Sequence, residues 1–196
     1  MFEWSDEQLM LRDAVRQFID KEIRPQVEDL EHGDLPPYDI LRKLFATFGM
    51  DAMARDRFAK QIAFEKEVAA AVERGEAPPE KPKREGGSAE SLTMIPILEL
   101  CRVCPGMVTA MGVSMGLTSA SINSKGTIAQ KERWVPELLT MEKIGAWAIT
   151  EPNSGSDAFG SMKSTARRDG DEYLLNGSKT FITNGPYADT IVFICK

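Results

Sequence analysis

The stretch WAITEPNSGSD, residues 147–157, carries the strongest local structural signal in the chain. Its apolar first residues favour a strand, and the rest is a turn rich in hydroxyl groups that contains Pro152 and Gly155. A second stretch, GSKTFITNG at residues 177–185, brings an aromatic residue and another threonine from the end of a further predicted strand. Turns at strand ends often carry function, and these two expose backbone and hydroxyl groups. Together they predict a cradle for a flat polar ligand.

The sequence around these stretches divides into two parts with different periodicity. Apolar residues recur at helical spacing up to about residue 143 and alternate with polar residues beyond it. This pattern predicts an α+β fold: an all-α helical bundle over residues 1–143, followed by the first strands of an antiparallel sheet or barrel over residues 144–196. The predicted strands cover residues 144–149, 161–168, 172–175, 179–182 and 190–195. Asp169-Gly170 and Asn176-Gly177 predict hairpin turns between them.

Residues 54–85 stand apart within the helical part. Residues 54–72 fit a partly amphipathic helix, whereas residues 75–85 contain three prolines and alternating charges. A segment of that composition buries too little apolar surface to fold, so it predicts an exposed, mobile linker. Near the other end of the chain, the last predicted strand runs almost to Lys196. We therefore expect the sheet to be completed by a longer polypeptide or by a partner.

Overall composition excludes several classes of protein. The 196 residues are 42% hydrophobic and 28% charged, with a net charge of −6, which argues against a nucleic-acid surface. No segment suits a bilayer span, and the acidic start lacks the features of an export signal. Three cysteines cannot all pair within the chain, which favours a reducing cytoplasmic compartment. Cys101 and Cys104 lack a second pair of ligands, so no metal site is expected.

The two opening stretches suit the chemistry of a flavin ring, which is flat and apolar on its faces but bears hydrogen-bonding atoms along one rim. Thr150 and Thr183 could supply donors to that rim, and Phe181 or Trp147 could cover a face of the ring. Each residue also has an ordinary explanation, because threonine and aromatic residues favour strands. Both interpretations stay open on these residues alone.

Residues 105–124 raise a second question about ligand contact. They combine small residues with Met107, Met111 and Met115. Small residues allow close approach of another helix or of a ligand, and methionine adapts to either. Tight helix packing and the lining of a chain-binding tunnel are both compatible with this composition.

Five segments, in order and spacing, resemble the acyl-CoA dehydrogenase family. They are GTIAQKERWVP at residues 126–136, AITEP with GSD at residues 148–152 and 155–157, GDEY with NGSK at residues 170–173 and 176–179, FITNG at residues 181–185, and AD at residues 188–189. The resemblance implies a helical amino-terminal domain followed by the start of the family's middle β-domain. The family's carboxy-terminal helical domain is expected to lie beyond residue 196.

The resemblance also implies FAD as cofactor and assigns roles to particular positions. The cofactor-binding positions would be Trp147, Ile149, Thr150, Gly155, Ser156, Phe181, Ile182 and Thr183. Ser156 would also contact the CoA part of the substrate, and Met111 and Met115 would lie near the acyl tunnel. The family's catalytic glutamate matches no residue of this chain, so these residues alone are expected to be inactive, and Glu151 is expected to be structural.

By the same resemblance, the expected function is α,β-desaturation of an acyl-CoA thioester. Electrons would pass to an electron-transfer flavoprotein, and the protein would be a homotetramer or homodimer, with a heteromer also conceivable. Two alternatives stay open: a non-catalytic subunit of a heteromeric dehydrogenase, and a same-fold acyl-CoA oxidase or flavin monooxygenase.

Overall fold

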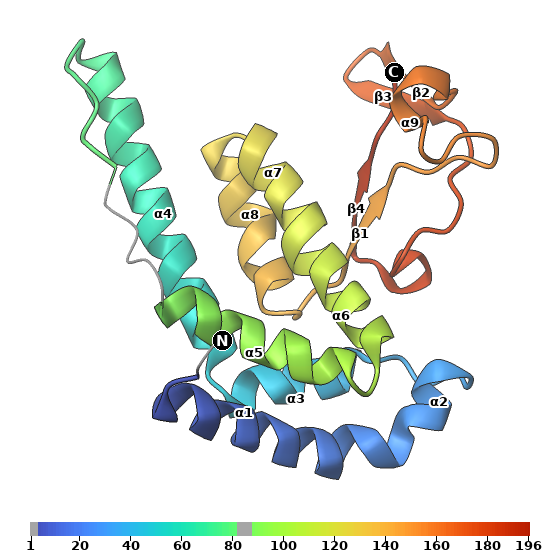
Figure 1. Cartoon of the computed structure of the whole chain (residues 1–196). Coiled ribbons are helices and arrows are strands. Elements are labelled where there is room, and N and C mark those ends of the chain that lie inside the picture. Colours follow the sequence, from blue (N-terminus) through green and yellow to red (C-terminus); the bar gives the residue numbers. More distant parts are fainter. Residues whose placement is uncertain (1–3, 82–87) are drawn as a thin grey trace. The chain divides into compact units, whose positions relative to one another are not determined.

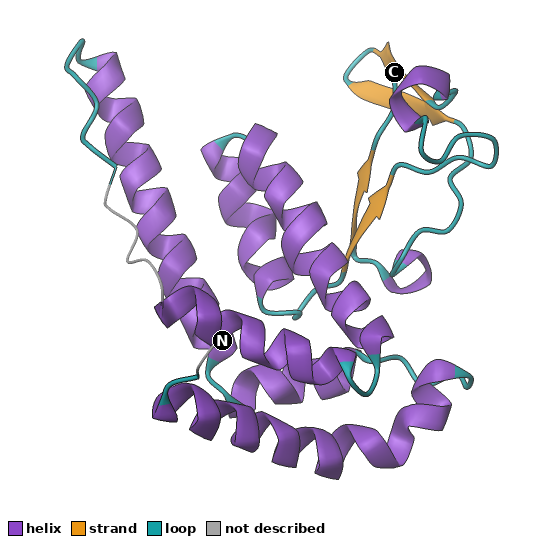
Figure 2. Cartoon of the chain, in the orientation of Figure 1, coloured by secondary structure: helices purple, strands orange, loops and turns teal. Residues whose placement is uncertain are grey.

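The computed structural model describes residues 4–81 and 88–196, with the side chains of residues 88–93 left out of the description. The chain forms two compact units, Met1–Met111 and Gly112–Lys196. Helices are the only regular secondary structure in the described part of the first unit, and strands begin only at Gly145 (Figure 2). Each unit is described separately below.

The first unit begins with α1 (Asp6–Phe18), whose start is fixed by a capping box between Ser5 and Gln8. The helix continues through a π turn, η1 (Ile19–Ile23), into a short 3₁₀ turn, η2 (Arg24–Gln26), and then α2 (Val27–Glu31). Pro25 lies at the change of helix type, as expected for a residue that lacks the N–H of a regular helix. α1 packs along α5 (Ser88–Cys101).

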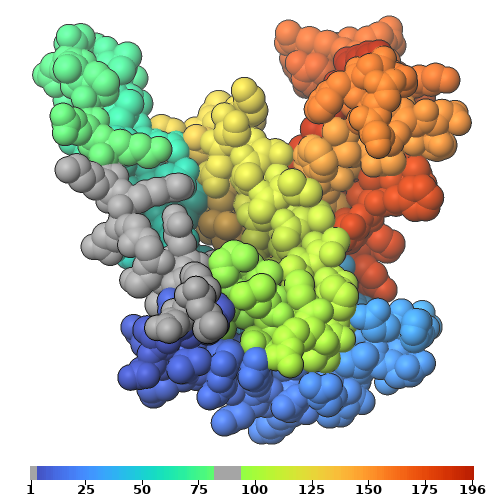
Figure 3. Space-filling model, in the orientation of Figure 1, coloured from blue at the N-terminus to red at the C-terminus, as the bar shows by residue number. Residues whose placement is uncertain are grey.

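Glycine separates the next two helices of this unit. α3 (Tyr38–Thr47) ends before Gly49, which adopts a left-handed backbone with φ of 63°. α4 (Met50–Glu73) then runs for 24 residues, so the helix predicted over residues 54–72 is part of a longer one. It extends away from α1, α3 and α5 (Figures 1 and 3). Beyond it, residues 74–81 are mostly exposed and outside regular structure, and the rest of the predicted linker, up to residue 85, lies outside the described residues.

The apolar core of the first unit comes from helices that face one another. Its most deeply buried members are Val15, Ile19, Ile23, Leu41, Leu44, Phe45, Ile95, Leu100 and Met107. Met107 belongs to α6 (Pro105–Gly112), the helix at which the first unit ends.

The second unit opens with three consecutive helical segments. A π turn, η3 (Val113–Thr118), leads into α7 (Ser119–Lys125), and α8 (Ile128–Leu139) follows after Gly126. Thr127 and Gln130 form a capping box at the start of α8. α7 packs against α8, and η3 packs against both α8 and the first strand.

Two small sheets complete the second unit. β1 (Gly145–Ala148) pairs with β4 (Thr190–Phe193), and β2 (Thr165–Asp169) pairs with β3 (Glu172–Asn176). The β2–β3 hairpin is antiparallel and turns at Asp169-Gly170, as predicted, with Gly170 at φ of 62°. The β1–β4 pair is parallel, which differs from the antiparallel arrangement predicted. Parallel pairing needs a long crossover, and residues 149–189 provide it.

Two further local predictions were wrong. Asn176-Gly177 makes no hairpin, because the segment predicted as a strand at residues 179–182 is a loop. The strand predicted over residues 161–168 is shorter, since a short helix, α9 (Ala158–Ser161), occupies its beginning. A 3₁₀ turn, η4 (Gly185–Tyr187), precedes β4.

The predicted fold class is confirmed: a helical region is followed by a short sheet region. Of the helices within residues 4–81 and 88–196, none is both long and apolar enough to span a membrane.

Candidate functional site

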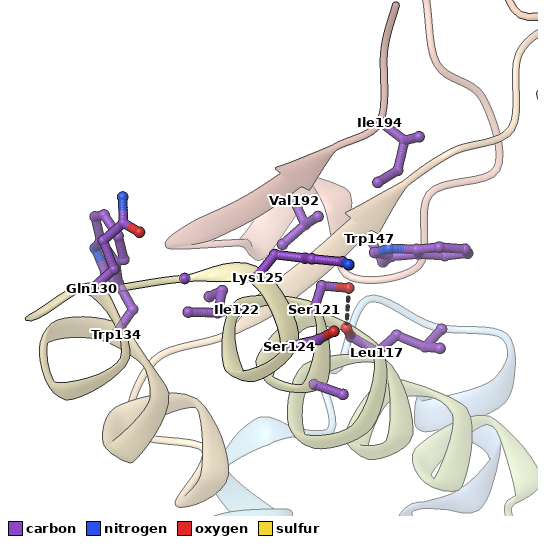
Figure 4. Close-up of a pocket in the computed structure, with 12 residues that line it drawn as sticks. Leu117, Ser121, Ile122, Ser124, Lys125, Gln130, Trp134, Trp147, Val192 and Ile194 are labelled. Carbon is purple, nitrogen blue, oxygen red and sulfur yellow. Dashed lines mark hydrogen bonds between the residues drawn. The ribbon is translucent and has the colours of Figure 1, made fainter. Parts of the chain in front are cut away.

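A pocket of about 700 Å³ lies within the second unit, between its helices and the parallel strand pair. Trp147, Val192 of β4 and Ile194 just after that strand line it opposite α7 (Figure 4). The lining is predominantly apolar, and Lys125 contributes a charged group at one side. The complete lining is Leu117, Ala120, Ser121, Ile122, Ser124, Lys125, Gly126, Gln130, Trp134, Trp147, Val192 and Ile194.

The helical wall of this pocket is fixed to the strand wall by Ser114. Its hydroxyl accepts a hydrogen bond from the Gly145 N–H at 2.9 Å and donates to the Leu138 carbonyl at 3.4 Å. Thr118 packs so closely on β1 that a Cβ at Gly145 would lie 2.8 Å from the Thr118 Cβ. Both contacts originate in the π turn η3, and π turns within helices are frequent next to functional sites.

Trp147 presents an unused donor at this site. Its ring is partly buried, and within the described residues its Nε1 is shielded from solvent without a hydrogen-bond partner. A buried indole N–H normally has a partner, because leaving it unpaired costs free energy. The observation therefore suits a ligand that brings an acceptor atom to β1.

Glu151, directly after the strand end, organises the loops around it. Its carboxylate accepts the N–H groups of Lys163 at 2.7 Å and Ser164 at 2.9 Å. It also pairs with the Lys179 ammonium at 3.0 Å. The turn that follows Glu151 closes through two backbone hydrogen bonds with Ser154, of 2.9 and 3.0 Å.

These contacts determine the ionisation of Glu151. The nearby Ser164 side chain, together with the hydrogen bonds from the Lys163 and Ser164 backbone and from Lys179, outweighs the effect of burial and lowers the pKa of Glu151 from 4.5 to about 2. A carboxylate with so low a pKa is a poor proton acceptor at neutral pH. Glu151 therefore has the properties of a structural anion, not of a general base.

Lys179 connects the two stretches that the sequence singled out. Its ammonium donates to the Ile149 carbonyl and to the Glu151 carboxylate, each at 3.0 Å. One residue further on, the Thr180 N–H donates to the Thr150 carbonyl at 3.0 Å. The end of β1 and the segment leading to Thr183 are thus held side by side.

The second stretch has an unusual backbone. Phe181 and Asn184 both adopt positive φ, at 55° and 66°, which is uncommon for residues other than glycine. Asn184 is buried and donates from its side-chain amide to the Gly145 carbonyl at 2.9 Å. Phe181, in contrast, is 91% exposed, so its ring is available to cover the face of a ligand.

The other predicted site residues occupy varied positions. Ile149, Thr150, Ile182 and Thr183 are half-buried, and Ile149 accepts a hydrogen bond from Lys179. Gly155 and Ser156 are exposed in the turn after Glu151. Met111 is buried in the first unit, and Met115 is half-buried in η3 of the second.

Sequence reasoning missed several residues that build this site. It did not assign roles to the pocket face of α7, to Val192 and Ile194, or to Lys179 and Asn184 as anchors. The small residues around α7 and the alternation over residues 190–195 were the available signals. The NGSK segment included Lys179 in the family resemblance, but its anchoring contacts could not be predicted, since its partners are 28 and 30 positions away.

The arrangement suits a flat ligand with acceptor atoms along its rim. Hydrogen-bond donors are available from Trp147 and from the threonines of the two stretches. The exposed ring of Phe181 belongs to the second stretch, two residues before Thr183. Within the described part of the chain, no group of three or more histidine, cysteine or acidic residues could hold a metal ion.

Comparisons with known proteins match both the helical part and the sheet part of the chain. The family model for the acyl-CoA dehydrogenase N-terminal domain matches residues 5–56 and 48–142, and the model for the middle domain matches residues 146–196. A short-chain-specific acyl-CoA dehydrogenase of Clostridium acetobutylicum is 33% identical over 191 residues, which are 97% of this chain and 44% of the relative.

Comparison with solved structures also matches the chain to acyl-CoA dehydrogenases. Butyryl-CoA dehydrogenase from Megasphaera elsdenii aligns with a TM-score of 0.68 and 26% identity, covering 100% of this chain and 45% of that one. An acyl-CoA dehydrogenase from Bacillus anthracis, solved in complex with FAD, aligns with a TM-score of 0.64 and 29% identity, covering 99% of this chain and 29% of that one.

The fold defines an α+β protein in which a helical region precedes a short sheet region. The chain belongs to the acyl-CoA dehydrogenase family. It spans 44% of the length of the Clostridium acetobutylicum relative.

Proposed function

We propose that this chain forms the helical domain and the beginning of the flavin-binding domain of an FAD-dependent acyl-CoA dehydrogenase. The observation that carries the proposal is the joining of the Thr150 and Thr183 stretches through Lys179, beside the unpaired Trp147 N–H. Residues 1–143 would be the helical domain and residues 144–196 the start of the β-domain. The family-model matches support this division.

FAD would be held by the residues of the two stretches. Trp147, Ile149 and Thr150 would border the ring at the end of β1, with Phe181 over a face and Thr183 donating to the rim. Gly155 and Ser156 would face the phosphates, because their exposed turn offers backbone and hydroxyl donors. When bound, FAD supplies the hydride acceptor for oxidation of the substrate.

In this proposal the substrate is an acyl-CoA thioester that is desaturated between its α and β carbons. Ser156 would contact the CoA portion, and Met111 and Met115 would lie near the acyl chain. Removal of the α-proton needs a base that is ionised at neutral pH and placed at the substrate. Glu151 is committed to three hydrogen bonds and does not suit that role, so the base is expected elsewhere in the protein.

Further properties belong to the same proposal: the electron acceptor and the oligomeric state rest on the family resemblance, and the compartment rests on the cysteine content. The electrons would leave through an electron-transfer flavoprotein, the protein would form a homodimer or homotetramer, and it would act in the cytoplasm. A same-fold acyl-CoA oxidase, a flavin monooxygenase and a non-catalytic subunit of a heteromer are the competing functions.

Anaerobic mixing of the purified, natural-length protein with acyl-CoAs of different chain length tests the proposal. Loss of the visible flavin absorbance without oxygen is the expected result. A flavin that no acyl-CoA bleaches would count against thioester desaturation. Bleaching followed by rapid recovery in air, with peroxide formed, would favour the oxidase.

A further inference from the structure

Lys179 and Glu151 form an ion pair that is almost closed to solvent. Their side chains are 5% and 7% exposed, and the Lys179 Nζ also lies 5.2 Å from the centre of the Phe193 ring. Burial of two charges is costly unless their geometry and hydrogen bonds are good, and here the carboxylate has two further N–H donors. Such a pair holds its groups in one arrangement.

The third contact of Lys179 is with a peptide group. Its ammonium donates to the Ile149 carbonyl, and the N–H of that same planar peptide belongs to Thr150. In a trans peptide the C=O and N–H bonds point in opposite directions, so the Thr150 N–H points away from the lysine. A charged donor on the carbonyl polarises the peptide and makes its N–H a stronger hydrogen-bond donor.

The Thr150 N–H has no partner of its own within the described residues. The parallel ladder ends where the Ile194 N–H donates to the Ala148 carbonyl, one residue pair before Thr150 would take part. The Thr150 carbonyl is occupied by the Thr180 N–H. The Ile149–Thr150 peptide is therefore held at its carbonyl by Lys179, and the following peptide is held at the Thr150 carbonyl, while the polarised Thr150 N–H stays available.

We propose that Lys179 is a positioning residue that holds and polarises the Ile149–Thr150 peptide so that the Thr150 N–H donates to a rim atom of the bound flavin. This inference rests on the proposed FAD site. Reduction adds negative charge to the hydrogen-bonding end of a flavin, and a fixed donor aimed at that charge favours the reduced form. Lys179 thereby raises the flavin reduction potential and tightens FAD binding.

The test is the midpoint reduction potential of the flavin in the natural-length protein, with FAD affinity measured alongside. Lys179→Met removes the ammonium and keeps a chain of similar length, so the potential should fall and FAD binding should weaken about tenfold. Lys179→Arg should restore part of the loss. Lys163→Met is the matched control, because the Lys163 side chain is exposed and only the Lys163 backbone contacts Glu151. The flavin reduction potential of this variant should equal that of the wild type.

Glu151→Gln separates polarisation from general damage. Removal of the carboxylate leaves the Lys179 charge less neutralised, so the flavin reduction potential should rise. General damage to the fold would instead lower FAD affinity in both Lys179→Met and Glu151→Gln, without shifting their flavin potentials in opposite directions. If Lys179→Met retains no FAD, the potential of Glu151→Gln alone still tests whether Lys179 polarises the peptide.

An unchanged potential in Lys179→Met, or a fall in Glu151→Gln, would overturn the role of Lys179. Absence of flavin binding by the unmodified protein would instead overturn the proposed function itself.

Discussion

At the scale of single residues, Trp147 carries a donor whose lack of a partner has a measurable consequence. The indole N–H is buried and unpaired in the described structure. The free-energy cost of this unpaired N–H should be removed when a ligand supplies a hydrogen-bond acceptor.

Trp147→Phe removes the N–H and keeps an aromatic ring. The flavin-free protein should then be as stable as the wild type or more stable, because an unpaired buried donor is gone. FAD binding should weaken about tenfold, since the ligand loses one hydrogen bond. Thermal unfolding without FAD and titration with FAD measure the two effects. Equal FAD affinity in the two proteins would mean that Trp147 makes no such bond.

The stability of the folded protein at low pH should depend on Glu151. The folded-state pKa of about 2 is lower than the ordinary value of 4.5, so the stability that this group contributes is complete above about pH 4.5 and is lost as the pH falls towards 2. The pKa values of Glu22 and Glu99 are also lowered, by Lys43 and Arg16 respectively, and those groups add to acid sensitivity.

Glu151→Gln should therefore lose less stability than the wild type between pH 5 and pH 2.5. Unfolding temperatures recorded across that range for both proteins provide the measurement. If the two curves run parallel, Glu151 is not the group that titrates.

At the scale of secondary-structure elements, Ser114 is the connection between the π turn and β1. Ser114→Ala should destabilise the protein by about 1–3 kcal/mol, because the buried Gly145 N–H would lose its acceptor. Chemical denaturation measures this loss.

Ser121→Ala is the matched control for that variant. The Ser121 hydroxyl in α7 donates to the Leu117 carbonyl of η3, one turn earlier, and makes no contact with β1 by this bond, so its removal should change stability by less than about 0.5 kcal/mol. A loss in Ser114→Ala no greater than in the control would show that the π turn and strand are held together by other contacts.

The elements also show which parts of the fold were predictable from sequence. The hairpin at Asp169-Gly170 was predicted because it depends on neighbouring residues, as the capping box at Ser5 and the end of α3 before Gly49 also do. The loop at residues 179–182 depends on distant partners, because Lys179 is drawn to Ile149 and Glu151. Its strand-like composition therefore gave the wrong structure.

Gly177 gives a second physical reason for that error. Its φ is 151°, and a Cβ at this position would lie 2.2 Å from the Ser164 Oγ. The glycine thus permits a close approach to Ser164, the residue before β2. It does not form the tight turn that Asn-Gly usually indicates. A contact of this kind cannot be recognised from the local sequence.

At the scale of the whole molecule, family membership and site geometry support the same account. The sequence segments predicted the family and the fold class, and both are confirmed. The individual roles of the site residues stay predictions. What sequence could not predict is how the two stretches are joined, since that depends on a buried ion pair and on a parallel crossover.

The central claim is that the Thr150 and Thr183 stretches hold FAD, and an FAD titration of the natural-length protein with and without the Thr183 hydroxyl tests it most directly. Thr183→Val preserves the shape of the side chain and should weaken FAD binding about tenfold. Thr165→Val, on the exposed start of β2, should bind FAD like the wild type. A wild-type protein that binds no FAD, or a Thr183→Val protein that binds it with unchanged affinity, would contradict the account.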